Sequence, residues 1–82
     1  MLKLYVFETC PYCRKVRKAF DEMGLEYDII RAERGTPENA ELVKIGGKSQ
    51  VPFLIDPERD VQMYESDDII AYAREHYGTA AN

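Results

Sequence analysis

Two cysteines, Cys10 and Cys13, lie near the amino terminus with two residues between them. They follow an apolar run at residues 2–7 and open a run at 13–20 whose apolar residues have helical spacing. Pro11 suits the first position of a helix, where its missing N–H would have no partner, so Cys10 is expected at the N-cap. The helix dipole and the unpaired N–H groups of the first turn favour a thiolate at that position. The pattern therefore predicts a nucleophilic sulfur at Cys10.

Cys13 is expected one helical turn beneath Cys10, close enough for a disulfide bond. It shares a helix face with Val16, Phe20 and Met23, which points its side chain toward the interior. One thiol would then be exposed and reactive and the other half-buried and protected. Thiol–disulfide exchange needs this combination of an attacking and a resolving sulfur.

Two other interpretations of the cysteine pair fit the sequence less well. Half of a zinc site has the same spacing, but zinc normally takes four ligands, and the chain has no third cysteine and a single histidine, His76. A structural disulfide would close a loop of roughly four residues and stabilise the fold little. The pattern therefore favours redox chemistry, with no metal site and no catalytic role for His76.

Length and charge limit the classes of function. The chain of 82 residues, of which 45% are hydrophobic, has room for one compact domain, 1–82, with a modest core. The net charge of −4, without a long block of one sign, argues against nucleic-acid binding. Arg14 and Lys15 lie near enough to the motif to stabilise a thiolate or attract an anionic partner, whereas Arg17 and Lys18 fit a solvated helix face.

The sequence predicts neither a signal peptide nor a membrane span. Lys3 and Glu8 interrupt the early apolar run, and no stretch approaches the roughly 18 apolar residues that a span requires. Two cysteines at catalytic spacing without an export signal predict a reducing compartment, with the cytoplasm as the default.

Apolar periodicity and turn residues predict the element order βαβαββα. The first two strands should be parallel, since a helix connects them, and the last two should form an antiparallel hairpin around a turn at 56–60. Ser66 is expected to cap the last helix, which Gly78 should end. The predicted strands are 2–7, 25–30, 51–55 and 61–64, and the predicted helices are 11–23, 37–46 and, after the Ser66 cap, 67–77.

This order, with a Cys-x-x-Cys at the first βα turn, resembles the thioredoxin fold. The segment Cys10-Pro11-Tyr12-Cys13 is similar to the motif of dithiol glutaredoxins. Val51-Pro52 is similar to the dipeptide of this family that carries a cis-proline facing the active site. The resemblance implies an α/β protein with a four-stranded mixed sheet flanked by three helices.

The start of the last helix departs from the usual glutaredoxin. Paired glycines are expected there, and this chain has Tyr64-Glu65-Ser66-Asp67-Asp68. Glu65-Ser66 and Gln50-Val51-Pro52 resemble the thioredoxin-like domain of glutathione transferases, in which an acid or amide followed by Ser holds the γ-glutamyl end of glutathione. The nearest resemblance is to the thioredoxin-like half of the glutathione-transferase-like bacterial glutaredoxins, without their helical second domain.

The resemblance implies a glutathione-dependent oxidoreductase that reduces protein–glutathione mixed disulfides and protein disulfides. Cys10 would take up glutathione, and a second glutathione or Cys13 would release it. Glutathione would be the electron donor, no cofactor would be bound, and the partners of an expected monomer would be glutathionylated or disulfide-containing proteins. The residues that the resemblance assigns to glutathione are Tyr12, Gln50, Val51, Pro52, Glu65, Ser66 and Asp67.

Two rival functions stay open. A glutathione transferase domain would conjugate glutathione to electrophiles, although such enzymes more often use a single Tyr, Ser or Cys at the helix start. An iron–sulfur cluster carrier would hold its cluster between two chains through Cys10 and glutathione. Such proteins more often have Gly after the first cysteine, where this chain has Pro11.

Overall fold

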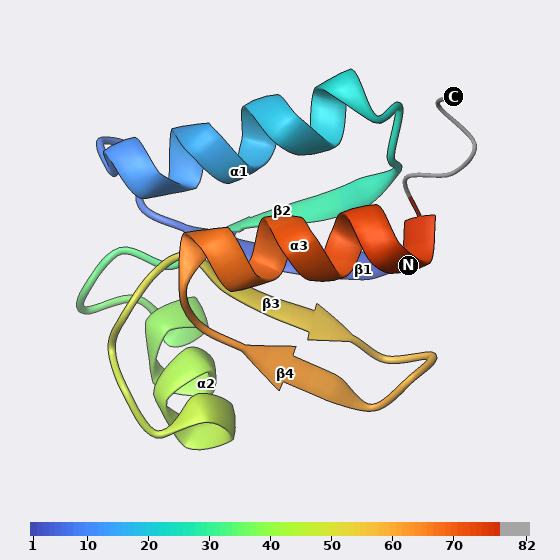
Figure 1. The fold of residues 1–82 in the computed structure, drawn as a ribbon. Coiled ribbons are helices and arrows are strands. Elements are labelled where there is room, and N and C mark those ends of the chain that lie inside the picture. The colour runs from blue at the N-terminus through green and yellow to red at the C-terminus, as the bar shows by residue number, and fades with distance from the viewer. Residues whose placement is uncertain (78–82) are drawn as a thin grey trace.

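The computed structural model describes residues 1–77, and it places helices on both faces of one four-stranded sheet (Figure 1). Helices α1 and α3 cover one face and α2 lies against the other (Figure 1). The predicted order βαβαββα and the predicted fold class are confirmed; Gly78 lies outside the described residues. The elements are β1 (Leu2–Val6), α1 (Pro11–Glu22), β2 (Tyr27–Arg31), α2 (Pro37–Gly46), β3 (Phe53–Asp56), β4 (Val61–Met63) and α3 (Ser66–Tyr77).

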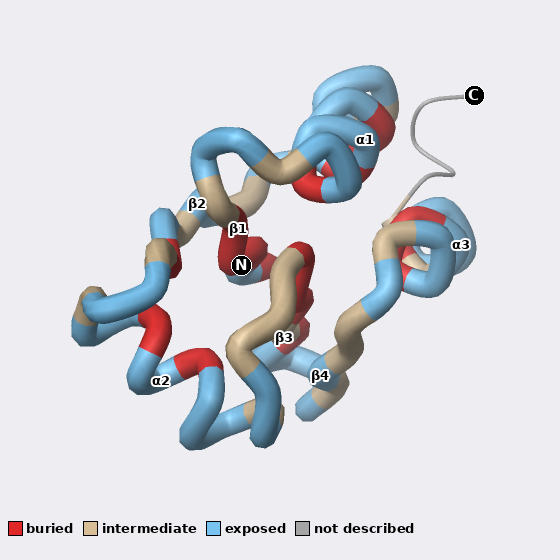
Figure 2. The backbone as a smooth tube through the Cα atoms, turned by 90° about the vertical axis from the view of Figure 1, so that its left-hand side faces the viewer, coloured by how far each residue is buried: buried red, intermediate tan, exposed pale blue. Residues whose placement is uncertain are grey.

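Strand β1 lies inside the sheet, whose order is β2-β1-β3-β4. It pairs in parallel with β2, as the connection through α1 predicts, and antiparallel with β3, where Leu4 faces Leu54. All residues of β1 except Lys3 are buried, and Figure 2 shows this buried segment at the centre of the molecule. The first βα turn therefore follows a strand that is buried in the middle of the sheet.

Two hydrophobic clusters fill the two layers between sheet and helices. Because side chains alternate along a strand, Leu4 and Val6 point to the cluster beneath α1 and α3, whereas Tyr5 points to the cluster beneath α2. Cys13 belongs to the first cluster, as predicted from its helix face. The second cluster is smaller and consists of Tyr5, Ala32, Leu42 and Phe53.

The prediction that Ser66 caps the last helix is wrong. Helix α3 already begins at Ser66, and the carbonyl of the preceding Glu65 accepts the first helical hydrogen bond from the Ile69 N–H at 3.0 Å. Glu65 has a positive φ of 62°, a left-handed conformation that sequence patterns do not reveal for glutamate. Strand β3 also starts two residues later than predicted, at Phe53, after Pro52, which has no N–H to donate to a ladder.

The sequence predicts a turn that begins at Asp56, but Asp56 is the last residue of β3 and its side chain is fully buried. Its carboxylate accepts hydrogen bonds from the hydroxyls of Tyr72 (2.6 Å) and Tyr77 (2.7 Å) and from Arg59 (3.3 Å). Burial acts to raise the pKa of Asp56, but these hydrogen bonds outweigh it and hold the pKa below its ordinary value. The carboxylate thus fastens the second half of α3 to the β3–β4 hairpin.

Candidate functional site

Cys10 occupies the N-cap of α1, as predicted. Its backbone is extended (φ −84°, ψ 118°), Pro11 takes the first helical position, and the Cys10 sulfur accepts a hydrogen bond from the Cys13 N–H at 3.3 Å. Cys10 is only partly buried, and both cysteines are free thiols in this structure. The sulfur therefore lies at the positive end of the helix with one donor already directed at it.

Cys13 has a contrasting environment, because only 1% of it is exposed. Burial, followed by the hydrogen bond with Cys10, raises the pKa of the Cys13 thiol to about 12, and the charge of Arg17 counteracts this only in part. Cys13 is therefore protonated at neutral pH. The two thiols differ in access, since Cys10 is partly exposed and Cys13 is buried, and this is the asymmetry in exposure that the sequence predicted.

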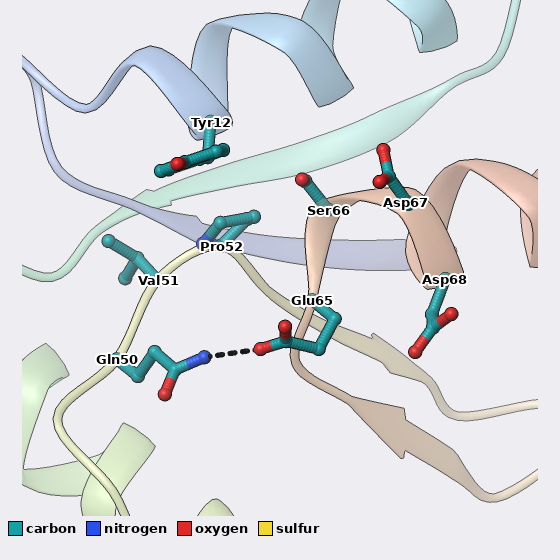
Figure 3. A pocket seen from close by; sticks show the side chains of 8 residues that line it. All are labelled: Tyr12, Gln50, Val51, Pro52, Glu65, Ser66, Asp67 and Asp68. Carbon is teal, nitrogen blue, oxygen red and sulfur yellow. Dashed lines mark hydrogen bonds between the residues drawn. The ribbon is translucent and has the colours of Figure 1, made fainter.

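A pocket of about 550 Å³ opens beside the first turn of α1 (Figure 3). All seven residues assigned to glutathione from sequence line it, although they come from three separate segments of the chain. The pocket also includes Asp68, which is not among the residues that the resemblance assigns to glutathione. Its lining residues are Tyr12, Gln50, Val51, Pro52, Glu65, Ser66, Asp67 and Asp68.

The wall nearest the cysteines is formed by Tyr12 and by the Val51-Pro52 dipeptide. Tyr12 is 63% exposed, so it contributes an open aromatic face rather than a core contact. The peptide bond between Val51 and Pro52 is cis, as the resemblance implied. Figure 3 shows the Tyr12 ring above these two residues, with open space between them and α3.

The opposite wall is the start of α3. The N–H groups of its first turn have no partner within the helix and carry the positive end of its dipole. The Ser66 side chain points toward the side of the pocket that carries Tyr12 (Figure 3). The Glu65 carboxylate accepts a hydrogen bond from the Gln50 amide at 2.8 Å, which closes the pocket between the two walls. This wall offers donors for a carboxylate and acceptors for an ammonium group in one place.

The two basic residues predicted near the thiolate lie on the exposed side of α1. Lys15 forms an ion pair with Asp67, which joins the first turns of α1 and α3 at the rim of the pocket. Both partners are exposed, Lys15 by 53% and Asp67 by 81%, so this pair contributes little to stability. A direct effect of Arg14 or Lys15 on the Cys10 sulfur stays a prediction.

The fold and the site together define a thioredoxin-like domain with a dithiol motif beside a pocket lined by hydrogen-bond donors and acceptors. The chain belongs to the family of glutathione S-transferase N-terminal domains, whose sequence profile matches residues 4–81. No helix within residues 1–77 is long and apolar enough to cross a membrane.

Similar proteins include glutaredoxins as well as glutathione transferases. The chain is 32% identical over 76 residues to glutaredoxin 2 of Escherichia coli K12, covering 87% of this chain and 32% of that protein. It is 31% identical over 77 residues to prostaglandin E synthase 2 of Mus musculus, covering 93% of this chain and 19% of that protein. A glutathione transferase homologue from Drosophila mojavensis, solved with bound glutathione, has a TM-score of 0.82 at 28% identity, covering 95% of this chain and 36% of its own. The chain thus spans between 19% and 36% of the length of these relatives.

Proposed function

We propose that this domain is a glutathione-dependent thiol–disulfide oxidoreductase that reduces protein–glutathione mixed disulfides and protein disulfides. The observation that carries the proposal is the N-cap sulfur of Cys10, next to a pocket with donors and acceptors for the γ-glutamyl end of glutathione. Membership of a glutathione S-transferase domain family supports the link to glutathione, and the similarity to glutaredoxin 2 supports the redox chemistry.

In the first step, the Cys10 thiolate attacks the glutathione sulfur of a mixed disulfide. A new disulfide forms between Cys10 and glutathione, the old S–S bond breaks, and its electron pair leaves on the sulfur of the substrate protein, which then takes a proton from solvent. The start of α3 holds the γ-glutamyl end through its N–H groups and the Glu65 carboxylate, and the backbone of Val51 holds the cysteinyl part. Tyr12 borders the bound glutathione.

The second step regenerates Cys10 by one of two routes. A second glutathione thiolate attacks the bound glutathione sulfur, forms oxidised glutathione and releases the Cys10 thiolate. Alternatively, Cys13 loses its proton and attacks the Cys10 sulfur, which forms the intramolecular disulfide and releases glutathione. Two further glutathione molecules then reduce this disulfide, leave as oxidised glutathione and return both cysteines to thiols. Burial raises the pKa of Cys13 to about 12, so the first route, which leaves this thiol protonated, should dominate deglutathionylation.

A transferase is the second candidate, because the matching family consists of glutathione S-transferase domains. Such a domain would use a Cys10-stabilised glutathione thiolate to attack an electrophile, and no disulfide would be needed. The spacing of Cys10 and Cys13 favours the oxidoreductase, since conjugation uses no resolving thiol. We also propose that the domain acts as a cytoplasmic monomer on glutathionylated and disulfide-containing proteins.

One pair of assays on the same preparation tests the proposal. The first follows the reduction of a glutathionylated peptide by glutathione, with oxidised glutathione as the measured product. The second follows the conjugation of glutathione to 1-chloro-2,4-dinitrobenzene. We expect catalysis in the first assay and no rate above the uncatalysed reaction in the second. Conjugation without deglutathionylation would replace the oxidoreductase with the transferase.

A further inference from the structure

The loop between α2 and β3, residues 47–52, carries Gln50, Val51 and Pro52 into the pocket, although it contains no helix or strand. A loop that has to be ordered when its ligand binds loses affinity to the entropy of ordering. Here three successive residues of the loop are each held by a residue outside the loop.

The first anchor is Tyr64, which follows β4. Its hydroxyl accepts a hydrogen bond from the Lys48 N–H at 3.1 Å and donates one to the Lys48 carbonyl at 2.9 Å. The next residue, Ser49, accepts a hydrogen bond from the buried Asn39 amide at 2.9 Å. Gln50 then donates to the carboxylate of Glu65, the residue that follows Tyr64. Two neighbouring residues after β4 therefore hold the loop on both sides of Ser49.

The Tyr64 ring is itself fixed on two sides. It packs against the buried Phe53, with ring centroids 4.6 Å apart. On its other side, a Cβ atom added to Gly46 would lie 2.1 Å from the Tyr64 hydroxyl oxygen and 2.7 Å from the ring carbon that bears it. The hydroxyl thus occupies space that only a glycine at the end of α2 leaves free.

We propose that Tyr64 is a positioning residue for the glutathione site. Its hydroxyl binds both polar groups of the Lys48 backbone and so sets the orientation of Gln50 and Val51 before the ligand arrives. Tyr64 is not among the residues that line the pocket, so it acts on binding through the loop. This inference rests on the proposed function insofar as the ligand is glutathione, and it does not depend on whether reduction or conjugation follows.

The test is Tyr64→Phe, which removes the hydroxyl and keeps the ring against Phe53. Calorimetric titration with S-methylglutathione, which cannot react with a thiol, measures binding alone. We expect its Kd to rise roughly three- to tenfold, because the loop must now be ordered on binding. The KM for a glutathionylated peptide should rise by a similar factor, with kcat and the rate of Cys10 alkylation by iodoacetamide unchanged.

Tyr72→Phe is the matched control. It also removes one tyrosine hydroxyl, whose 2.6 Å bond to the buried Asp56 carboxylate lies outside the pocket lining. This control should lose at least as much stability as Tyr64→Phe, because its bond is to a charged acceptor, and should keep the Kd of the wild type. An unchanged Kd in folded Tyr64→Phe, or an equal rise in both variants, would overturn the positioning role.

The same titration separates this inference from the proposed function. A wild-type chain that binds S-methylglutathione but does not reduce glutathionylated peptide would overturn the oxidoreductase alone. Loss of affinity in Tyr64→Phe would then still support the positioning role. A wild-type chain that does not bind S-methylglutathione at all would overturn the glutathione site, and the role of Tyr64 with it.

Discussion

Replacement of Asp56 by asparagine should destabilise the domain more than any other change of similar size outside the pocket. Three donors converge on one carboxylate oxygen, from Tyr72, Tyr77 and Arg59, and the Glu58 N–H donates to the other oxygen at 3.2 Å. An asparagine amide can present its oxygen to the first three donors only by turning its NH₂ group toward the Glu58 N–H. It also removes the charge that strengthens every one of these bonds.

Hydrogen bonds to charged groups contribute about 1.5–3 kcal/mol each, so weakening three and losing one gives an expected loss of about 2–4 kcal/mol for Asp56→Asn. That is a large share of the roughly 5–15 kcal/mol that stabilises an ordinary domain. Urea unfolding followed by far-ultraviolet circular dichroism measures the difference. The matched control is Asp60→Asn, which removes the same charge from an exposed residue of the adjacent turn and should change little.

The loss should also depend on pH in a defined direction. The pKa of Asp56 is lower in the folded protein than its ordinary value, so its stabilisation is complete above the unfolded pKa of about 3.9 and is lost as the pH falls through the folded pKa. The difference between wild type and Asp56→Asn should therefore be largest at neutral pH and shrink below roughly pH 4. A difference that stays constant with pH, or a loss no larger than that of Asp60→Asn, would refute this reasoning.

Three further outcomes follow from the geometry. At neutral pH iodoacetamide should alkylate Cys10 and leave Cys13 unmodified, because burial and a pKa of about 12 keep Cys13 a protected thiol. Mass spectrometry measures the labelling of each cysteine, and equal labelling would contradict this prediction. Ser66→Ala should raise the KM for glutathionylated peptide more than its change in unfolding free energy explains, whereas unaltered kinetics would leave Ser66 only a helix residue. Gly46→Ala should lower the thermal midpoint of unfolding more than Gly47→Ala. A Cβ at Gly46 would collide with Tyr64, whereas Gly47 has free space around it and only a left-handed φ of 90° to maintain. A larger decrease in the midpoint for Gly47→Ala would disprove the close contact at Gly46.

Local rules of sequence were enough to predict where the two cysteines lie. Pro11 sets the start of the helix, so the N-cap position of Cys10 follows from its neighbour, and the burial of Cys13 follows from the spacing of the apolar residues after it. The pocket required more, since its residues come from distant segments. Only the resemblance to glutathione-binding families predicted that these segments share one site. In the structure they line the same pocket.

Two of the missed features depend on contacts between residues far apart in the chain. Asp56 begins a segment, residues 56–60, whose composition is typical of a turn. Its side chain is a buried acceptor because of the hydroxyl groups of Tyr72 and Tyr77, which lie 16 and 21 residues away. The Tyr64 hydroxyl binds the backbone of Lys48, 16 residues earlier in the chain. Helix and strand periodicity does not predict contacts over such a separation. The left-handed conformation of Glu65 shifted the start of α3, because glutamate gives no sign of a positive φ.

The central claim is that Cys10 is the attacking sulfur and Cys13 only a resolving one. The most direct measurement is the reduction of a glutathionylated peptide by glutathione with wild type, Cys10→Ser and Cys13→Ser, alongside the reduction of a protein disulfide. We predict that Cys10→Ser falls to the uncatalysed rate with both substrates, because the 77 described residues place no other thiol at a helix N-terminus. Cys13→Ser should keep deglutathionylation and lose most protein disulfide reduction. Equal loss of deglutathionylation in the two variants would contradict the account.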